Sequence, residues 1–166
     1  MRTFFIRSFS QFTGNVDLEQ DNGKSFNCAE SVLIRVNREN PLPDYESCCM
    51  KIASVLGGGV AGTGEICGAV SGAVVCIALL FGTDGTEPLD DFKSKRSQAR
   101  EVVKILLKDF TDDWGSVQCR NLLAMDKGMA PQIGTRRSNQ SSRTLCEEYV
   151  DWAVKKTEEI RNDNNI

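Results

Sequence analysis

The chain has 166 residues, a formal net charge of -3 and no histidine, with acidic and basic side chains interspersed. This length predicts one domain, and the absence of a basic stretch argues against nucleic acid as a partner. Without histidine the chain can have no Ser-His-Asp triad, Cys-His dyad, His-ligated haem or His-containing zinc site. Acid–base chemistry would therefore fall to carboxylates, Lys, Tyr or Cys.

Cysteine is abundant, with seven residues, and the odd number leaves at least one thiol free or bound to something else. Near the start of the sequence, only Phe4-Phe5-Ile6 is apolar before another charge, so no cleavable signal peptide is predicted. The expected location is the cytoplasm, where thiols are kept reduced. Many cysteines in that compartment favour redox or metal chemistry over structural disulfides.

The first predicted helix follows a mixed, weakly periodic segment, residues 1–24, which we expect to form an arm or a short helix. A turn is predicted at Asn22-Gly23. Asn27 is the expected N-cap of a helix that ends at about residue 37, and Cys28 falls in its first turn. The apolar stripe of this helix has the i, i+3, i+4, i+7 spacing and consists of Ala29, Val32, Leu33 and Val36.

Two helices are predicted on either side of a glycine-rich run. The first is capped by Asp44 and covers about residues 45–56, after the break that Pro41-Leu42-Pro43 imposes. The glycines end it, and the next helix covers about residues 64–81, with Cys67 in its first turn or so. That second helix is apolar nearly all round, which is typical of the centre of a bundle.

The almost uncharged segment at residues 66–82 is not expected to cross a membrane. It has about seventeen residues, fewer than the roughly twenty that a span needs. Gly68, Ser71 and Gly72 also make it less apolar than a typical span. We therefore expect a buried core helix and no membrane partner.

Three further helices are predicted towards the end of the sequence. They cover about residues 89–112, a segment that starts at Ser116, and about residues 142–161. Cys119 and Cys146 fall on the apolar sides of the last two helices. These cysteines join Cys28 and Cys67 as candidates for thiol chemistry.

The predicted fold is all-α, a single-domain bundle of five or six helices around the central apolar helix at about residues 64–81. No segment shows the alternation with a period of two that is typical of strands. The helical domain is expected at residues 25–161, with a long connection over 125–140 and a frayed tail at 162–166. Small residues on the central helix would also permit a homo-oligomer.

The glycine-rich run, residues 57–64, formally matches the G-x-G-x-x-G pattern of dinucleotide sites. Nothing downstream completes the βαβ unit that such a site needs. No Lys follows the glycines as a Walker A loop requires, so no nucleotide cofactor is expected. Two interpretations stay open: a plain helix stop, or free amides at the next helix N-terminus that hold an anion or a thiolate.

Cys67 is a candidate reactive thiol because the positive end of a helix dipole favours a thiolate. Glu65 would act in the opposite direction if its carboxylate faced the sulfur. The alternative is that Cys67 is a small buried apolar residue, as cysteine often is.

The positions of the other cysteines separate those expected to be ordinary helix or core residues from those that could act together at a site. Cys48 and Cys49 are adjacent, so their side chains diverge by about 100° on a helix, and ordinary helix positions are favoured. Cys76 falls nearly opposite Cys67 on the central helix, where core packing is expected. The remaining four lack C-x-x-C or ferredoxin spacing, so a metal site would need one ligand from each of four helices: Cys28, Cys67, Cys119 and Cys146.

Four segments resemble the family of redox-active proteins named for the C-GCAxxG-C-C motif. Residues 26–32 (Phe-Asn-Cys-Ala-Glu-Ser-Val) are similar to its first cysteine segment, and residues 56–73 are similar to its central signature. Residues 115–123 resemble the third cysteine segment, and Cys146 lies in the fourth. The resemblance covers about residues 20–159.

This resemblance implies a helical protein with a redox role. The residues that would carry the role are Cys28, Cys67, Cys119 and Cys146, with Glu65 and Gly68 as neighbours. The sequence departs from the family in a longer N-terminal segment, an extended connection over 125–140, and three extra cysteines. Those extra thiols, which make a simple count of two disulfides doubtful, are Cys48, Cys49 and Cys76.

Three hypotheses for the function follow. The leading one is a thiol-based redox protein, acting in thiol–disulfide exchange or electron transfer with a redox partner that the sequence does not name. In it Cys67 is the more nucleophilic thiolate and Cys28 resolves it as a disulfide, since both lie near helix N-termini. The second is a module that binds zinc or an iron–sulfur cluster through the same four cysteines. The third is a non-catalytic interaction protein whose cysteines pack in the core.

Overall fold

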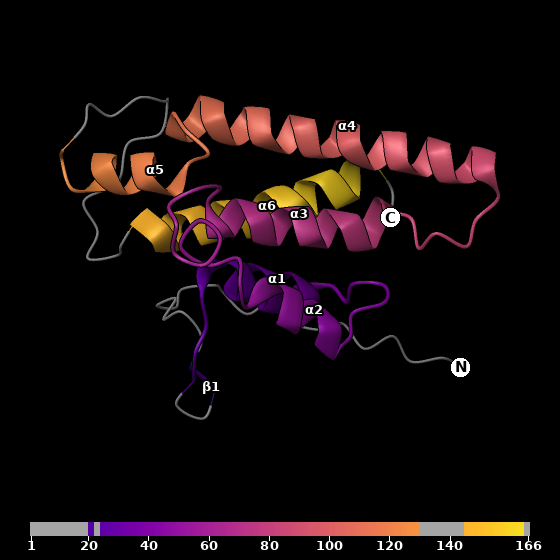
Figure 1. Cartoon of the computed structure of the whole chain (residues 1–166), viewed down its shortest axis with the longest axis horizontal. Coiled ribbons are helices and arrows are strands. Elements are labelled where there is room, and N and C mark those ends of the chain that lie inside the picture. The colour runs from indigo at the N-terminus through magenta and orange to yellow at the C-terminus, as the bar shows by residue number, and fades with distance from the viewer. Residues whose placement is uncertain (1–19, 22–23, 130–144, 165–166) are drawn as a thin grey trace, which may run out of the picture.

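The computed structural model describes residues 20–21, 24–129 and 145–164, which form six helices and two short strands (Figure 1). The strands β1 (Gln20–Asp21) and β2 (Lys24–Ser25) pair antiparallel. The prediction of an all-α bundle is confirmed for these residues. The helices are α1 (Cys28–Glu39), α2 (Ser47–Ala53), α3 (Gly68–Phe81), α4 (Leu89–Trp114), α5 (Cys119–Asp126) and α6 (Leu145–Asp163).

Several sequence predictions fall wholly or partly outside the described residues. They concern the arm or short helix before residue 20, the turn at Asn22-Gly23, the connection over residues 130–140 and the helix start at Ser142. Where the end of the predicted arm is described, it forms the strands β1 and β2. The tail predicted to fray from residue 162 stays helical as far as Asp163.

The first helix begins where predicted because Asn27 caps it. The Asn27 Oδ1 atom accepts hydrogen bonds from the amides of Ala29 (2.9 Å) and Glu30 (3.1 Å). The Glu30 carboxylate accepts in turn from the Asn27 amide at 2.8 Å, which completes a capping box. The Asn27 side-chain amide also donates to the carbonyls of Ala53 and Ser54. The cap therefore ties the start of α1 to the end of α2.

The second helix differs from the prediction at both ends. Glu46 rather than Asp44 occupies its N-cap, because Asp44 adopts a φ of 53° in the turn that precedes the helix. Asp is one of the few residue types that tolerate this left-handed region. The helix ends at Ala53, before the glycine-rich run is reached.

The central position predicted for the apolar helix is confirmed, since α3 packs against α1, α4 and α6 (Figure 1). Its contact with α1 is close because Gly72 has no side chain. A Cβ atom there would lie 2.7 Å from the Ala29 carbonyl oxygen. Among the described residues, α3 included, no helix combines the length and apolar composition that a membrane span requires.

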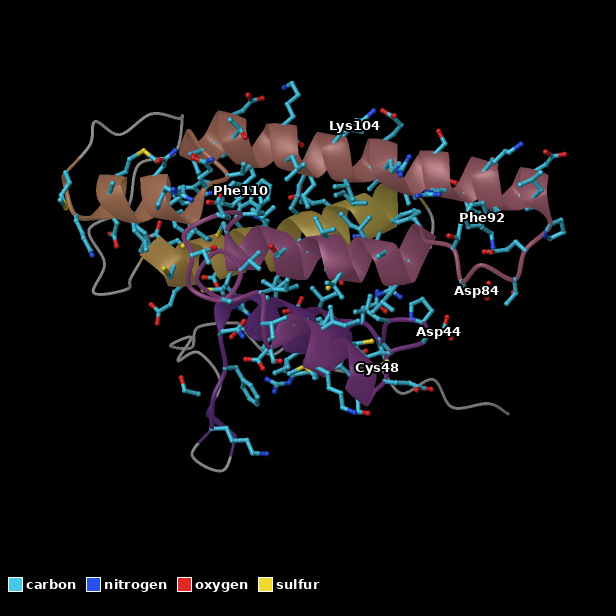
Figure 2. All side chains as sticks on the ribbon, in the orientation of Figure 1. Asp44, Cys48, Asp84, Phe92, Lys104 and Phe110 are labelled. Atoms are coloured by element: carbon cyan, nitrogen blue, oxygen red, sulfur yellow. The ribbon has the colours of Figure 1, made fainter. Side chains whose placement is uncertain are left out.

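The long helix α4 has its buried residues only in its second half. Phe110 lies on the side of α4 that faces α3 and α6 (Figure 2). Its ring packs edge-on against Tyr149 and Trp152 of α6, with centroids 5.8 and 5.0 Å apart. The buried residues of α4 are Leu106, Phe110 and Trp114, so its first half leaves a face without a buried side chain.

Candidate functional site

The glycine-rich run forms a left-handed turn that carries the chain from α2 to Cys67. Residues 58–62 all have positive φ, from 51° at Ala61 to 76° at Gly59. The amide of Glu65 closes the turn by donating to the Gly59 carbonyl at 3.0 Å. Because this turn extends past residue 64, the prediction that the central helix starts there is wrong. Cys67 is the N-cap of α3 and does not lie in its first turn.

A short antiparallel bridge then fixes Cys67 beside Cys119. The Cys67 amide donates to the Val117 carbonyl at 2.8 Å, and the Cys119 amide donates to the Glu65 carbonyl at 2.6 Å. Since residues 116–118 form this connection, α5 begins at Cys119 and not at Ser116 as predicted. Figure 1 shows the result, with the loop before α3 lying beside α5 and the start of α6.

An ion pair closes the bridge on its exposed side. Arg120 donates from Nη2 to the Glu65 carboxylate, and both side chains are about half exposed. The Arg120 amide and Nε also donate to the Gly64 carbonyl, at 3.0 and 3.2 Å. The Glu65 carboxylate is therefore engaged by Arg120 and not by the Cys67 thiol.

Two glycines leave room for two of the cysteines. A Cβ on Gly68 would lie 3.1 Å from the Cβ of Cys28 and 3.3 Å from the Leu56 carbonyl oxygen. A Cβ on Gly59 would lie 2.9 Å from the Cβ of Cys119. These separations are tighter than side chains usually allow, so the glycines permit Cys28 and Cys119 to approach the start of α3.

The structure thus brings together the four cysteines that the sequence singled out, each from a different segment. We call them the thiol cluster: Cys28 of α1, Cys67 at the N-cap of α3, Cys119 of α5 and Cys146 of α6. The thiols of Cys28 and Cys146 lie close enough that each shifts the pKa of the other. Cys67 and Cys119 lie close enough that a charge on either one would act on Cys28.

Within this cluster, the hydrogen bond from Cys146 lowers the pKa of Cys28, even though burial and the two neighbouring thiols oppose the shift. The same bond raises the pKa of Cys146, and burial and the carboxylates of Asp126 and Glu147 add to that increase. Cys28 is also the first residue of α1, where the helix dipole favours a negative charge. When the pair loses a proton, the charge therefore belongs on Cys28, and Cys146 acts as the donor.

The net pKa shift of Cys67 has the opposite direction, and its main cause is burial. Burial raises the pKa of the Cys67 thiol to about 11, although the backbone amides of Val70 and Ala69 favour the thiolate. Burial also raises the pKa of Cys119. The amides at the helix end favour the Cys67 thiolate as expected, but the net pKa is raised because the loss of solvation outweighs them.

The three other cysteines lie apart from the thiol cluster. Cys49 and Cys76 belong to the hydrophobic core, and burial raises the pKa of Cys76 to about 12. Cys48 is exposed on α2, on the side of the molecule away from α5 (Figure 2). All seven cysteines lie among the described residues, and none of them is disulfide-bonded.

Two residues near the cluster were missed by the reasoning from sequence. Tyr149 is buried on α6, and its pKa is raised by burial and by the neighbouring Cys146 and Cys67. Its position three residues after Cys146 was the available signal, because residues at that spacing share a helix face. Arg120 was identified only as part of a motif, and its distance in sequence from Glu65 concealed their ion pair.

The arrangement places a cysteine of lowered pKa beside a second thiol, which is the combination that thiol–disulfide exchange requires. Metal binding by the same four cysteines is the second of the three hypotheses. Within the part of the chain that the structure describes, no group of three or more His, Cys, Asp or Glu side chains is arranged to hold a metal ion.

The fold and the thiol cluster define a class, an α-helical protein whose four cysteines come from four segments and meet at one end of a bundle. A family model described as "Putative redox-active protein (C_GCAxxG_C_C)" matches residues 26–160, and the chain belongs to this family. The resemblance found in the sequence is thereby confirmed. No curated protein and no solved structure shows a significant match to the chain.

Proposed function

We propose that the thiol cluster is a dithiol–disulfide redox centre in which Cys28 and Cys146 are the pair that cycles. The observation that carries this proposal is the approach of Cys28 on α1 to Cys146 on α6, where the interaction between the two thiols lowers the pKa of Cys28. The thiolate is the attacking form of cysteine. Both residues are also partly exposed, whereas Cys67 and Cys119 are buried. A partner can therefore reach Cys28 and Cys146 more readily than the other two thiols.

The reaction is an exchange with a disulfide-bearing partner. The Cys28 thiolate attacks one sulfur of the partner's disulfide, which breaks that bond, forms a mixed disulfide and releases the first partner thiolate. Cys146 then gives up its proton and attacks the Cys28 sulfur, which releases the second partner thiolate. Two electrons pass from the cysteine pair to the partner, whose thiolates take up protons according to their pKa, and each step is reversible.

Cys67 and Cys119 have a supporting role in this scheme. A charge on either would raise the pKa of Cys28, and burial keeps both protonated at neutral pH. Neither of these two thiols then places a negative charge beside the Cys28 thiolate. The proposed pair replaces the Cys67–Cys28 pair expected from the sequence. It retains the expected cytoplasmic location, where a reduced thiol pool would return the pair to its dithiol form.

The proposal is tested by incubating the full chain with glutathione disulfide in a Cys48→Ser background, which removes the exposed thiol outside the cluster. Peptide mapping without reduction should find a Cys28–Cys146 disulfide. In the Cys146→Ser variant the mixed disulfide cannot be resolved, so one glutathione should remain on Cys28. The Cys28→Ser variant should show neither product.

Two results would overturn the proposal. One is a disulfide that consistently joins Cys67 to Cys28 or to another cysteine, with no Cys28–Cys146 disulfide formed. The other is a stoichiometric metal ion or a visible cluster absorption in anaerobically purified protein that is lost when Cys28 or Cys146 is replaced. That second result would favour the metal-binding alternative. The Cys76→Ser variant serves as the control, because its buried thiol lies outside the cluster.

A further inference from the structure

A groove of about 550 Å³ runs between α3 and the first half of α4, away from the thiol cluster. Its apolar lining includes Val74, Ile77 and Ala78 from α3 and Ala99 and Val103 from α4. Eight residues of helix separate the lining positions at the two ends, so the groove is about 12 Å long. The first half of α4 has no buried side chain of its own, which is why the space stays open.

Three cations line the same groove, Arg96, Arg100 and Lys104. They recur every four residues on α4, so they share one face of the helix. Arg96 lies over the ring of Phe92, 5.6 Å from its centroid, and Lys104 pairs with Glu101 at 2.7 Å. Among the described residues, no carboxylate forms an ion pair with Arg96 or Arg100. The groove thus combines an apolar floor with two guanidinium groups that no carboxylate of the described residues neutralises.

We propose that this groove binds a free single-chain carboxylate with an apolar tail. The tail would lie on the α3–α4 floor, and the carboxylate would pair with Arg96 and Arg100, since guanidinium groups match carboxylates in geometry and charge. The groove has the volume of a small-molecule site, which is roughly 300–1,000 Å³. That volume favours a single chain over a helix from a partner protein.

Two other occupants fit the observations less well. A second copy of the chain, docked symmetrically on this face, would bring the same cations together. A membrane surface is usually recognised by clusters of roughly four to eight basic residues, whereas three cations line this groove and Lys104 already has a carboxylate partner. The proposal of a carboxylate ligand does not depend on the redox proposal, because the two sites are separate. The groove begins about 10 Å along α3 from Cys67.

The test is isothermal titration calorimetry of the full chain with dodecanoate, kept below its critical micelle concentration. We expect saturable binding at one site. Arg96→Gln and Arg100→Gln should each weaken it at least about tenfold, because each removes a charge-assisted hydrogen bond. Lys93→Gln is the matched control, because Lys93 is an exposed cation on the same helix that does not line the groove. Dodecyltrimethylammonium, with the same tail and the opposite charge, should not bind.

A second variant tests the floor of the groove. Ala78 is exposed, so Ala78→Phe should fill the groove and abolish dodecanoate binding while leaving the circular dichroism spectrum and melting temperature unchanged. Equal binding of the cationic amphiphile would overturn the proposal, as would unchanged affinity in both arginine variants. Sedimentation that finds a dimer in the parent and a monomer in Ala78→Phe would also overturn it, because the groove would then be an interface between copies.

Discussion

Cys28 and Cys67 both lie at the start of a helix, yet their thiols have opposite pKa shifts. Cys28 is partly exposed and accepts a hydrogen bond from Cys146, so its thiolate is stabilised. Cys67 is only 4% exposed, and the loss of solvation raises its pKa to about 11. The position on a helix is therefore a weaker determinant of thiol reactivity here than access to water and to a donor.

This difference predicts the order in which the thiols are alkylated. Between pH 6 and pH 9, iodoacetamide should modify Cys28 faster than Cys67, because only the thiolate reacts. Replacing Cys146 with Ala removes the hydrogen-bond donor and should shift the pH profile of Cys28 upward. Quenched labelling followed by mass spectrometry measures both profiles. Faster modification of Cys67 than of Cys28 at pH 7 would contradict this prediction.

Cys76 predicts how the stability of the fold depends on pH. Its folded-state pKa, about 12, lies above its ordinary value of 9.0, so the folded protein binds the thiol proton more tightly than the unfolded chain. The resulting stability is complete below pH 9 and is lost as the pH rises towards 12. In Cys76→Ala, the fall in unfolding free energy over this range should be shallower by up to about 1.4 kcal/mol per pH unit.

Urea unfolding at a series of pH values measures this slope. An identical slope in Cys76→Ala and the parent would show that the buried thiol is not the titrating group.

At the scale of residues, the sequence predicted the identity of the four cysteines but not their order of reactivity. Cys28, Cys67, Cys119 and Cys146 could be selected by their motif. Their pKa values depend on burial and on contacts between helices, which no local spacing encodes. Asn27 was predictable because a cap acts within three residues, whereas Asp44 was misjudged because its φ of 53° is set by the turn around it.

The contact between α1 and α3 depends on the absence of one side chain. A Cβ on Gly72 would lie 2.7 Å from a backbone oxygen of α1 and 3.0 Å from the Ala29 Cα atom. Backbone atoms cannot move aside as a flexible side chain can, so the helices would have to separate. Gly72 therefore determines how closely α1, which carries Cys28, approaches α3.

This geometry predicts that Gly72→Ala destabilises the fold. Alanine in a helix interior is normally favoured over glycine by about 1 kcal/mol. Here the overpacking should outweigh that gain and lower the unfolding free energy by about 1–3 kcal/mol. Urea unfolding measures the change, with Ser71→Ala as the neighbouring control on the same helix. A Gly72→Ala protein more stable than the parent would disprove the close contact.

The left-handed turn before α3 contains a position where a substitution should raise the unfolding free energy, in contrast to Gly72→Ala. Val60 has a φ of 60° and is 40% exposed, and the left-handed conformation costs a residue with a β-branched side chain about 1–2 kcal/mol. Val60→Gly should therefore raise the unfolding free energy by up to about 1 kcal/mol, after the extra entropy of the unfolded glycine is counted. Val55→Gly, at an exposed position outside this left-handed segment, should lower it. Equal effects at both sites would contradict this reasoning.

Among the elements, the central helix was predictable and its first residue was not. A long apolar segment identifies α3 wherever it occurs in a sequence. Its start depends on the turn at residues 58–62 and on the bridge between Cys67 and Val117, which joins two distant segments. Local patterns therefore located the helix but placed its N-terminus too early.

At the scale of the whole molecule, α1 and α6 meet at the thiol cluster. Cys28 lies on α1 and Cys146 on α6, and both helices pack on α3. The all-α architecture followed from periodicity, whereas the meeting of these two helices at one end of the bundle did not. It requires the complete packing arrangement, since no turn or motif spans the two segments.

The proposed disulfide should therefore stabilise the whole fold. A cross-link that closes a loop of about a hundred residues reduces the entropy of the unfolded chain by an amount worth up to about 5 kcal/mol, less any strain. We expect the free energy of unfolding of the oxidised protein to exceed that of the reduced protein by roughly 3 kcal/mol. The oxidised protein should therefore unfold at a higher urea concentration. Equilibrium unfolding in the Cys48→Ser background measures the difference. In Cys146→Ser, the oxidant should have no such effect.

The distance in sequence between Cys28 and Cys146 also has a consequence for synthesis of the chain. The ribosome releases α1 and α3 long before α6, so Cys28 first reaches the cell without the donor that lowers its pKa. An incomplete chain therefore carries ordinary thiols and the exposed apolar faces that α6 will later cover. The lowered pKa of Cys28 arises only when α6 docks, which makes it a property of the finished protein.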